Sequence, residues 1–381
     1  MHRGEGRAVK RFLCILLFPL FLPVGAGSCA SEELSVAAKG AVLIDAKSGR
    51  VLFGQNENER FPMASTTKIM TALLALENCA LDETVTASEN ASGVPGTSIY
   101  LGVGETLTME EMLYGLLLRS GNDAAVAIAE HVSGSAEAFA ARMNARAAEL
   151  DADAHFVNPH GLDADGHEAS ALALARIFRQ AMQNGDFRRI TGTQKATIPW
   201  VDNDFSRVLT NKNRLLTTYA GATGGKTGYT SDAGRCLVFS AEREGMELIG
   251  VVLSCPNWFA EAERMLDWGF ENYHLEAPLA AGDVACEPAV EGGMAGTVTA
   301  VAESGLAAAV GKGETWRVEY DFPGGVRAPL EKGETIGMAT LYIEGTPAAQ
   351  TPLLAGEDVE KRDLASAIRR LLTRWVLLFA T

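Results

Sequence analysis

The stretch PMASTTK, residues 62–68, places a serine and a lysine three residues apart at the start of a helical pattern. Residues three apart share a helix face, so the Lys68 amine can reach the Ser65 hydroxyl. A serine nucleophile needs a base, and a desolvated lysine can serve as one. The positive potential of a helix N-terminus favours developing negative charge and a neutral amine. Alone the pattern is weak, because S-x-x-K arises by chance and Ser-Thr-Thr also caps helices.

Two further motifs follow in order. SGN at 120–122 falls between two helical stretches, where a loop can present both polar side chains, and KTG at 226–228 begins a strand after two glycines. S-x-x-K, then S-x-N, then K-T-G is the order found in penicillin-binding proteins and class A β-lactamases. A look-alike at 47–49 precedes the serine, and another at 88–90 does not link two long helices. Three ordered motifs on fitting elements make a strong signal.

Strand patterns open and close the main body of the chain, with helical patterns between them. Strands are predicted at 41–44, 51–53, 225–230, 235–241 and 247–253. Helices are predicted at 66–77, 108–118, 123–131, 136–150, 169–183 and 258–270. This order predicts an α+β domain in which two parts of one sheet are brought together across a mostly helical insertion. Residues 277–358 alternate Val, Ala and Thr with many Gly and Pro, which predicts a small all-β domain.

Both ends of the chain differ from its body. Residues 1–30 carry four basic residues among the first eleven, continue with an apolar run at 12–22 and end in small residues, a pattern typical of an export signal. Eleven apolar residues cannot span a bilayer as a helix, which needs about 20. Residues 361–381 carry a local charge of +4 and apolar residues at helical spacing, which predicts an amphipathic helix on an anionic membrane surface. A helix packed on the protein's own acidic surface is the alternative.

Composition limits the class of partner. The 381 residues are 47% apolar and 21% charged, which is typical of globular proteins. The formal charge is −15, and without residues 1–30 the balance is 29 basic against 47 acidic residues. An acidic body of this kind is repelled by phosphate backbones, which argues against a nucleic-acid partner.

Cys79, Cys236, Cys255 and Cys286 follow the export signal. We expect these cysteines to be unpaired, because a large domain has enough hydrophobic core to be stable without disulfide bonds. Cys29 only faintly resembles a lipidation site.

Longer stretches identify the family that the chain resembles. PMASTTK at 62–68, NPHGL at 158–162, GKTGYT at 225–230 and RAPLEKG at 327–333 resemble the low-molecular-mass penicillin-binding proteins. These are serine-type D-alanyl-D-alanine carboxypeptidases, of the peptidase S11 type. The resemblance implies a β-lactamase/transpeptidase-like catalytic domain with an antiparallel sheet, followed by a small all-β domain. It also implies peptidoglycan stem peptides as substrates, β-lactams as covalent inhibitors, no cofactor, and a place on the outer face of the cytoplasmic membrane.

The predicted organisation therefore has four parts. They are a signal peptide at 1–30, a catalytic domain at 31–275, an all-β domain at 276–358 and a C-terminal membrane anchor at 359–381.

The resemblance implies roles for three catalytic residues. Ser65 would attack the carbonyl between the two terminal D-alanines and form an acyl-enzyme. Lys68 would take the Ser65 proton, and Ser120 would pass a proton to the leaving amine. Water would then release the shortened peptide.

Substrate-binding roles follow from the same resemblance. Asn122 would hold the substrate backbone and orient the catalytic lysine. Lys226 and Thr227 would bind the terminal carboxylate. Gly228 lies between them and Tyr229, whose backbone N–H would form the oxyanion hole together with that of the serine.

Three alternatives remain. Zinc-dependent peptidases with this activity exist, and a cluster of possible ligands comprises His155, His160, His167, Asp163 and Asp165. No metal is expected there, because histidine-rich loops are more often structural. A β-lactamase is the nearest enzymatic rival, and the extra all-β domain and the Gly at 121 argue against it. A catalytically idle wall-binding scaffold is the third, which the intact motifs oppose.

Overall fold

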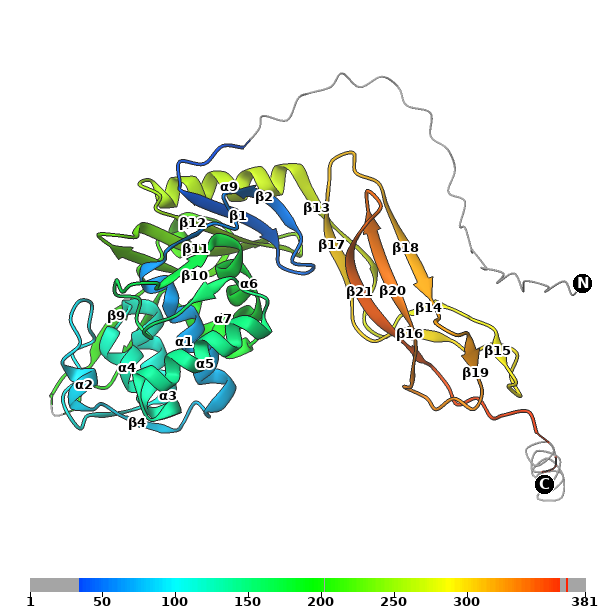
Figure 1. The fold of residues 1–381 in the computed structure, drawn as a ribbon, viewed down its shortest axis with the longest axis horizontal. Coiled ribbons are helices and arrows are strands. Elements are labelled where there is room, and N and C mark those ends of the chain that lie inside the picture. The colour runs from blue at the N-terminus through cyan, green and yellow to red at the C-terminus, as the bar shows by residue number, and fades with distance from the viewer. Residues whose placement is uncertain (1–33, 202, 364–367, 369–381) are drawn as a thin grey trace, which may run out of the picture. The chain divides into compact units, whose positions relative to one another are not determined.

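The computed structural model of the protein describes residues 34–201, 203–363 and 368 (Figure 1). The expected export signal at 1–30 lies outside the described residues, and so does most of the expected C-terminal helix. None of the helices in the described part of the chain is long and apolar enough to cross a bilayer.

A five-stranded antiparallel sheet positions the rest of the first domain, in the order β10-β11-β12-β1-β2. The strands are β1 (Gly40–Asp45), β2 (Val51–Gln55), β10 (Ala222–Thr230), β11 (Gly234–Arg243) and β12 (Met246–Leu253). The hairpin from β11 to β12 turns through positive φ angles at Glu244 and Gly245, as tight hairpins require. Because β1 pairs with β12, the early and late strands join into one sheet, as predicted.

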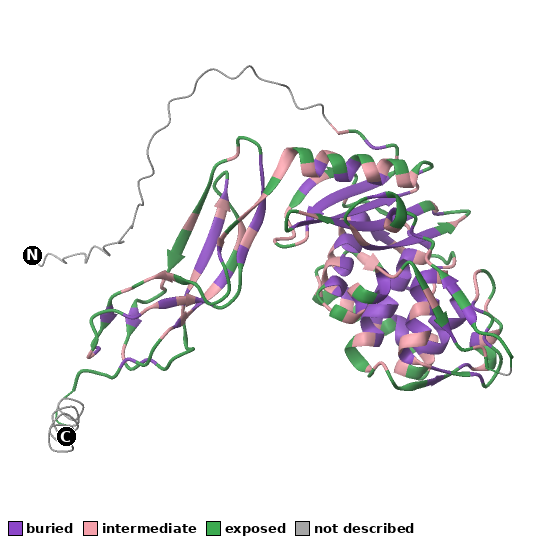
Figure 2. Ribbon diagram, turned by 180° about the vertical axis from the view of Figure 1, so that it is seen from behind, coloured by how far each residue is buried: buried purple, intermediate pink, exposed green. Residues whose placement is uncertain are grey.

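Both faces of this sheet are covered. Along β1, Val42 and Ile44 pack into one core while Ala41 and Leu43 pack into another, which is the alternation of a strand buried on both sides. Helix α9 (Trp258–Asn272) contributes to the second core and contacts β11 and β12. Helix α6 (Ala171–Met182) covers the other face against β1 and β12. Figure 2 shows the buried residues along these strands.

The insertion between β2 and β10 is mostly helical, as predicted. Its helices are α1 (Lys68–Asn78), α2 (Glu89–Ser92), α3 (Met109–Tyr114), α4 (Asn122–Ser133), α5 (Ala136–Glu149), α6, α7 (Gly185–Thr191) and α8 (Leu215–Thr218), with a 3-10 turn η1 (Ala64–Thr67) and a π-helical turn η2 (Gly115–Arg119). Its short strands are β3 (Arg60–Pro62), β4 (Thr84–Thr86), β5 (Thr106–Thr108), β6 (Ala154–His155), β7 (Glu168–Ser170), β8 (Lys195–Ile198) and β9 (Arg207–Thr210). The first eight residues of α1 are all buried, so α1 is the central helix of this group.

Two of the predicted helices differ in extent. The helix expected at 169–183 begins at Ala171, because the Ser170 side chain caps it by accepting a hydrogen bond from the Ala173 N–H. The helix expected at 108–118 begins after Thr108, which forms a capping box with Glu111. It then widens into the π-helical turn η2, a change that no local propensity indicates.

The described residues from 273 to 363 contain strands but no helix, as expected of an all-β domain. The strands are β13 (Tyr273–Leu279), β14 (Val284–Cys286), β15 (Val290–Glu291), β16 (Ala300–Ala302), β17 (Leu306–Gly311), β18 (Trp316–Asp321), β19 (Val326–Arg327), β20 (Thr335–Ile343) and β21 (Thr346–Ala355). Five of them form a sheet in the order β14-β16-β21-β20-β18. Its core includes Leu306, Val310, Leu341 and Leu353.

The all-β domain continues a few residues beyond 358, where we expected it to end. Val359 is 2% exposed and exchanges two backbone hydrogen bonds with Leu330. The Arg362 N–H donates to the Gly292 carbonyl. Residues 359–363, where we expected the anchor to begin, are therefore not helical, and the residues after Asp363 lie outside the described part except for position 368.

Candidate active site

The predicted nucleophile lies in a tight turn just before the central helix. Ser65 is part of η1, and α1 begins three residues later at Lys68. Two hydroxyl groups hold the turn: Thr66 Oγ1 donates to the Met63 carbonyl over 2.6 Å, and Thr67 Oγ1 donates to the Ala64 carbonyl over 2.8 Å. The serine hydroxyl is thereby presented at a constrained backbone position.

Lys68 is completely buried and its Nζ meets three oxygen atoms. Nζ lies 2.9 Å from Ser65 Oγ, 2.8 Å from Asn122 Oδ1 and within hydrogen-bond distance of the His160 carbonyl. The amide and carbonyl oxygens can only accept, so they take both N–H groups of a neutral amine. The remaining lone pair then faces the serine hydroxyl. This geometry suits a general base for the serine proton.

Electrostatics favour the neutral form of this amine. Burial holds the pKa of Lys68 well below its usual range, and the positive charges of Lys226 and Lys212 lower it further. Asp123 acts in the opposite direction. Because desolvation is the largest cause, the shift follows from the position of the lysine under the catalytic turn.

A second lysine meets the second serine. Lys226, on β10, is 1% exposed, and its Nζ donates to Ser120 Oγ over 2.9 Å and to the Thr227 carbonyl over 2.7 Å. Burial, aided by the charge of Lys212, lowers the pKa of Lys226 to about 7. Ser120 has φ +65° at the end of η2, a left-handed conformation that turns the chain into α4.

Strand β10 passes directly beside the catalytic turn. A Cβ atom at Gly228 would lie 2.9 Å from the Ser65 backbone nitrogen and 3.1 Å from the Met63 carbonyl oxygen, so only glycine permits this approach. Thr227 is buried, whereas the Tyr229 side chain is 66% exposed. Because Lys68 Nζ contacts Asn122 and Lys226 Nζ contacts Ser120, the three predicted motifs meet beside this edge strand of the sheet.

The turn at 158–162 contributes to the site through its backbone, which the sequence did not reveal. Asn158 Oδ1 accepts from the N–H groups of His160 and Gly161. Gly161 has φ +86°, and a Cβ atom there would lie 2.0 Å from the Ala64 carbonyl oxygen. The turn therefore packs on the catalytic turn and aims the His160 carbonyl at Lys68. A carbonyl has no sequence signature of its own.

Asp123 is a second contributor that sequence reasoning missed. It is 1% exposed and accepts from the backbone N–H groups of Ile99 and Leu101 and from the Ser98 hydroxyl. These contacts hold the loop whose Pro95 carbonyl accepts from Asn122 Nδ2 over 2.7 Å. Asp123 is thus a positioning residue for Asn122. An acidic residue directly after the SGN motif was the available signal.

The histidines weighed as metal ligands contact the protein backbone instead. His160 Nδ1 accepts from the Leu162 N–H, and His155 Nδ1 lies 2.8 Å from the Gly166 carbonyl. His167 Nδ1 accepts from the Val157 N–H, which leaves Nε2 to donate to Thr67 Oγ1. Burial lowers the pKa of His167 to about 4 and that of His160 to about 3. Both rings are therefore neutral structural groups near pH 7.

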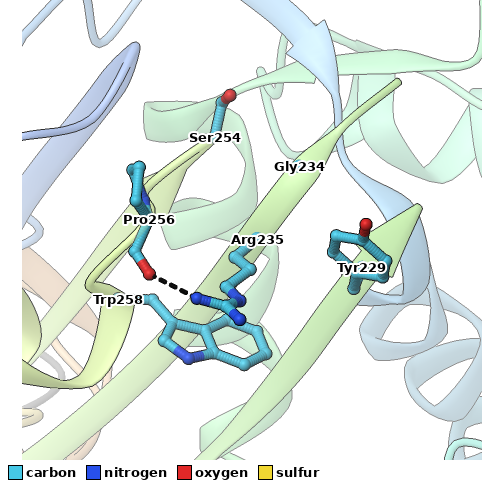
Figure 3. A pocket seen from close by; sticks show the side chains of 6 residues that line it. All are labelled: Tyr229, Gly234, Arg235, Ser254, Pro256 and Trp258. Carbon is cyan, nitrogen blue, oxygen red and sulfur yellow. Dashed lines mark hydrogen bonds between the residues drawn. The ribbon is translucent and has the colours of Figure 1, made fainter. Parts of the chain in front are cut away.

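A pocket of about 440 Å³ adjoins the end of β10 (Figure 3). It is lined by Tyr229, Gly234, Arg235, Ser254, Pro256 and Trp258. The Arg235 guanidinium donates to the Pro256 carbonyl over 2.7 Å and lies 6.0 Å from the centre of the Trp258 ring. The pocket thus offers one cation and two aromatic rings beside the predicted oxyanion residue.

Comparison with known proteins identifies the family. Residues 27–257 match the family described as D-alanyl-D-alanine carboxypeptidase, peptidase S11, and residues 273–361 match the C-terminal domain of penicillin-binding protein 5. D-alanyl-D-alanine carboxypeptidase DacF of Bacillus subtilis is 34% identical, over 96% of this chain and 99% of that protein. D-alanyl-D-alanine carboxypeptidase DacC of Escherichia coli is 30% identical, over 90% and 89% of the two chains.

A solved structure extends this likeness to three dimensions. Penicillin-binding protein 5 from Haemophilus influenzae is 29% identical, with a TM-score of 0.74 over 87% of this chain and 99% of that one. The likeness spans both the catalytic and the all-β domain. Because the family match covers more than half of the chain and one relative is similar along nearly all of it, the chain belongs to the D-alanyl-D-alanine carboxypeptidases of peptidase family S11, the low-molecular-mass penicillin-binding proteins.

Proposed function

We propose that this protein hydrolyses the terminal D-Ala-D-Ala bond of peptidoglycan pentapeptides through an acyl-enzyme on Ser65. The activity is that of a serine-type D-Ala-D-Ala carboxypeptidase, EC 3.4.16.4. The observation that carries the proposal is the 2.9 Å contact of Lys68 Nζ with Ser65 Oγ. The two N–H groups of the neutral amine donate to Asn122 Oδ1 and to the His160 carbonyl, so its lone pair is left for the serine proton.

Acylation begins when the neutral Lys68 amine takes the Ser65 proton. The serine oxygen attacks the carbonyl of the penultimate D-alanine, and negative charge develops on the carbonyl oxygen. The backbone N–H groups of Ser65 and Tyr229 are the donors proposed for that oxygen. Their support is the close passage of β10 beside the catalytic turn, which the absence of a side chain at Gly228 allows.

Departure of D-alanine requires a proton on its amine. Ser120 is positioned to relay it, because its hydroxyl accepts from Lys226 Nζ. In the proposed step Ser120 gives its proton to the leaving amine and regains the proton that Lys68 took from Ser65, so Lys68 is neutral again before water attacks. Lys226 and Thr227 bind the terminal carboxylate in this proposal, and Lys212 adds positive potential to the same region. Like-charged lysines close together favour an anionic ligand.

Water completes the cycle. It attacks the Ser65 ester while Lys68 takes its proton, and Lys68 then returns that proton to Ser65 Oγ as the ester bond breaks, which releases the tetrapeptide and regenerates the enzyme. A β-lactam would follow the same first step, but its ring-opened acyl group stays attached to the enzyme. β-Lactams are therefore expected as slowly released covalent inhibitors.

The direct test is release of free D-alanine from a pentapeptide ending in D-Ala-D-Ala. The wild-type protein should release one D-alanine per peptide, and a Ser65→Ala variant should release none above background. Addition of a chelator should leave the rate unchanged, because the proposed chemistry uses no metal. Faster turnover of penicillin than of the pentapeptide would favour a β-lactamase, and no covalent adduct at all would favour a scaffold.

We also propose that the protein is exported and held at the outer face of the cytoplasmic membrane. The support is the basic and apolar pattern of residues 1–30, together with the +4 charge and the helical spacing of apolar residues in 361–381. Both segments lie largely outside the described residues, so the proposal rests on sequence.

A further inference from the structure

We propose that Cys79, Glu83 and His131 bind one divalent transition-metal ion, with Zn²⁺ preferred, at a site separate from the serine chemistry. The thiol sulfur, one carboxylate oxygen and one ring nitrogen of these residues all lie within 4.8 Å of one another. His131 Nε2 and Glu83 Oε2 are already 3.2 Å apart. Tetrahedral zinc, with bonds of about 2.0–2.3 Å, holds neighbouring ligand atoms about 3.3–3.6 Å apart. A small closure of the group would therefore complete three corners of a tetrahedron.

The set of donors selects the type of ion. A thiolate and an imidazole are ligands for zinc and neighbouring transition metals, whereas calcium and magnesium require oxygen ligands throughout. Three protein ligands leave the fourth position of the ion to water. The site is half-buried at Cys79 and open at the other two residues, so an ion can reach it from solvent.

The backbone holds the three ligands in place. Cys79 is the C-cap of α1, with its N–H bonded to the Ala75 carbonyl. Glu83 Oε1 accepts from the Ala80 N–H over 2.6 Å, which leaves Oε2 directed at the histidine. His131 lies in the last turn of α4. Such hydrogen bonds to a ligating carboxylate are the outer contacts that tune metal sites.

One neighbouring cation must be considered. That cation is Arg142, whose charge acts on the Cys79 thiol. Its guanidinium is bonded to Asn78 Oδ1 and to the Val132 carbonyl, so it is held beside the group and does not occupy it. Zinc binds the thiolate form of cysteine, so binding of the ion displaces the proton of the Cys79 thiol.

The location of the site predicts a structural role. Helix α1 begins at Lys68 and helix α4 begins at Asn122, so their N-terminal ends carry catalytic groups. Cys79 and His131 lie at the opposite ends of the same two helices. At 1.5 Å per residue, the 11 residues of α1 separate the ion from the lysine by about 16 Å. The ion would fasten the far ends of the two helices without touching substrate.

The test uses the full chain, reduced and freed of metal, and titrated with Co²⁺ and Zn²⁺. We expect one equivalent of Co²⁺ to give a thiolate-to-metal charge-transfer absorption band that Zn²⁺ removes. Zn²⁺ should also slow alkylation of Cys79, measured by peptide mass spectrometry, and raise the melting temperature because it binds only the folded state. The rate at which penicillin acylates Ser65 should stay the same with and without Zn²⁺.

Variants identify the ligands. His131→Gln and Cys79→Ala should each weaken Zn²⁺ binding by at least about tenfold, and Cys79→Ala should remove the absorption band. The matched control is His274→Gln, because His274 Nε2 also faces a carboxylate, Glu276 Oε1, at 3.0 Å but without a thiol. If Cys79→Ala does not fold, the proposal is still tested by the Zn²⁺ affinity of His131→Gln and by the Co²⁺ charge-transfer band of the wild-type protein. Absence of the band, or equal Zn²⁺ affinity in His131→Gln and the control, would overturn the proposal.

Discussion

The protonation state of one amine decides whether Ser65 can react. Lys68 lies under the catalytic turn without contact with solvent, and burial together with two neighbouring lysines disfavours its charged form. An ordinary lysine, with a pKa of 10.5, would be charged and unable to accept a proton at neutral pH. The same burial that costs stability therefore provides the base.

The acylation rate should consequently fall at acid pH, with a midpoint well below the usual pKa range of lysine. Because the base form is lost as pH falls through the lowered pKa, kcat/KM should decrease toward acid and be fully developed well below pH 10.5. Lys68→Arg should lose about 10²–10⁴-fold at every pH, since a guanidinium cannot release its proton. Acylation by a fluorescent penicillin measures both. An acid limb near pH 10.5, or an active Lys68→Arg variant, would refute the assignment.

Lys226 predicts a second pH effect, on substrate selectivity. If its charge binds the terminal carboxylate, an amidated substrate should react roughly ten- to a hundredfold more slowly at pH 6, by the strength of a charge-assisted hydrogen bond. Burial lowers the pKa of Lys226 to about 7, so the charge and the preference should both shrink as the pH rises above that value. Competition between acid and amide peptides across pH 6–9 measures the ratio. A preference that is absent, or that grows with pH, contradicts this role.

At the scale of the elements, the turn at 158–162 supports the catalytic turn. Gly161→Ala would have to hold φ +86° and place Cβ 2.0 Å from the Ala64 carbonyl. The left-handed backbone alone costs about 1–2 kcal/mol, and relief of the contact must move Ser65. We expect a lower melting temperature and a loss of acylation.

Gly134→Ala is the matched control for that substitution. Gly134 has φ +80° at the end of α4, but a Cβ atom there meets nothing within 4 Å. It should lose similar backbone stability while keeping full acylation. Equal acylation rates in the two variants, measured with the same fluorescent penicillin, would show that the turn has no part in positioning Ser65.

The elements also show how far a sequence can predict this structure. Periodicity located α1, α4 and α5 to within about two residues, because their apolar faces are regular. It did not predict the π-helical turn η2 or the left-handed Ser120. These depend on contacts from elsewhere, such as the Lys212 N–H on the Leu118 carbonyl. Likewise the motifs named the side chains of the site but not the His160 carbonyl, whose role arises only from tertiary packing.

For the whole molecule, the site exists only when the chain closes on itself. Ser65 follows the first strands, whereas Lys226 lies on β10 after the helical insertion, and the pairing of β1 with β12 unites the two parts. The order of strand and helix patterns along the sequence predicted this arrangement. The all-β domain extends past residue 358 because backbone groups beyond that residue pair with earlier parts of the domain. The alternation of residue types in the sequence does not reveal such pairing.

Negative and positive charge are separated along the chain, and this separation predicts membrane binding. The chain without its first thirty residues is strongly acidic, while 361–381 carries +4. The exported protein should pellet with anionic lipid vesicles, and less so at high salt, because salt screens the attraction. A version ending at Asp363 lacks Arg369, Arg370 and Arg374 and the apolar residues around them, but it keeps the last paired residues of the all-β domain, so it should remain in the supernatant with full peptidase activity. Equal pelleting of both versions would exclude the tail as the anchor.

The covalent step at Ser65 is tested most directly by mass spectrometry of the penicillin-treated protein. Wild-type protein should gain the mass of one penicillin, located on the peptide that contains Ser65. The reason is that Lys68 Nζ contacts the Ser65 hydroxyl, whereas the Ser120 hydroxyl contacts Lys226. The Ser65→Ala variant should gain no mass. An adduct on another residue, or an unmodified wild-type protein after prolonged exposure, would contradict the account.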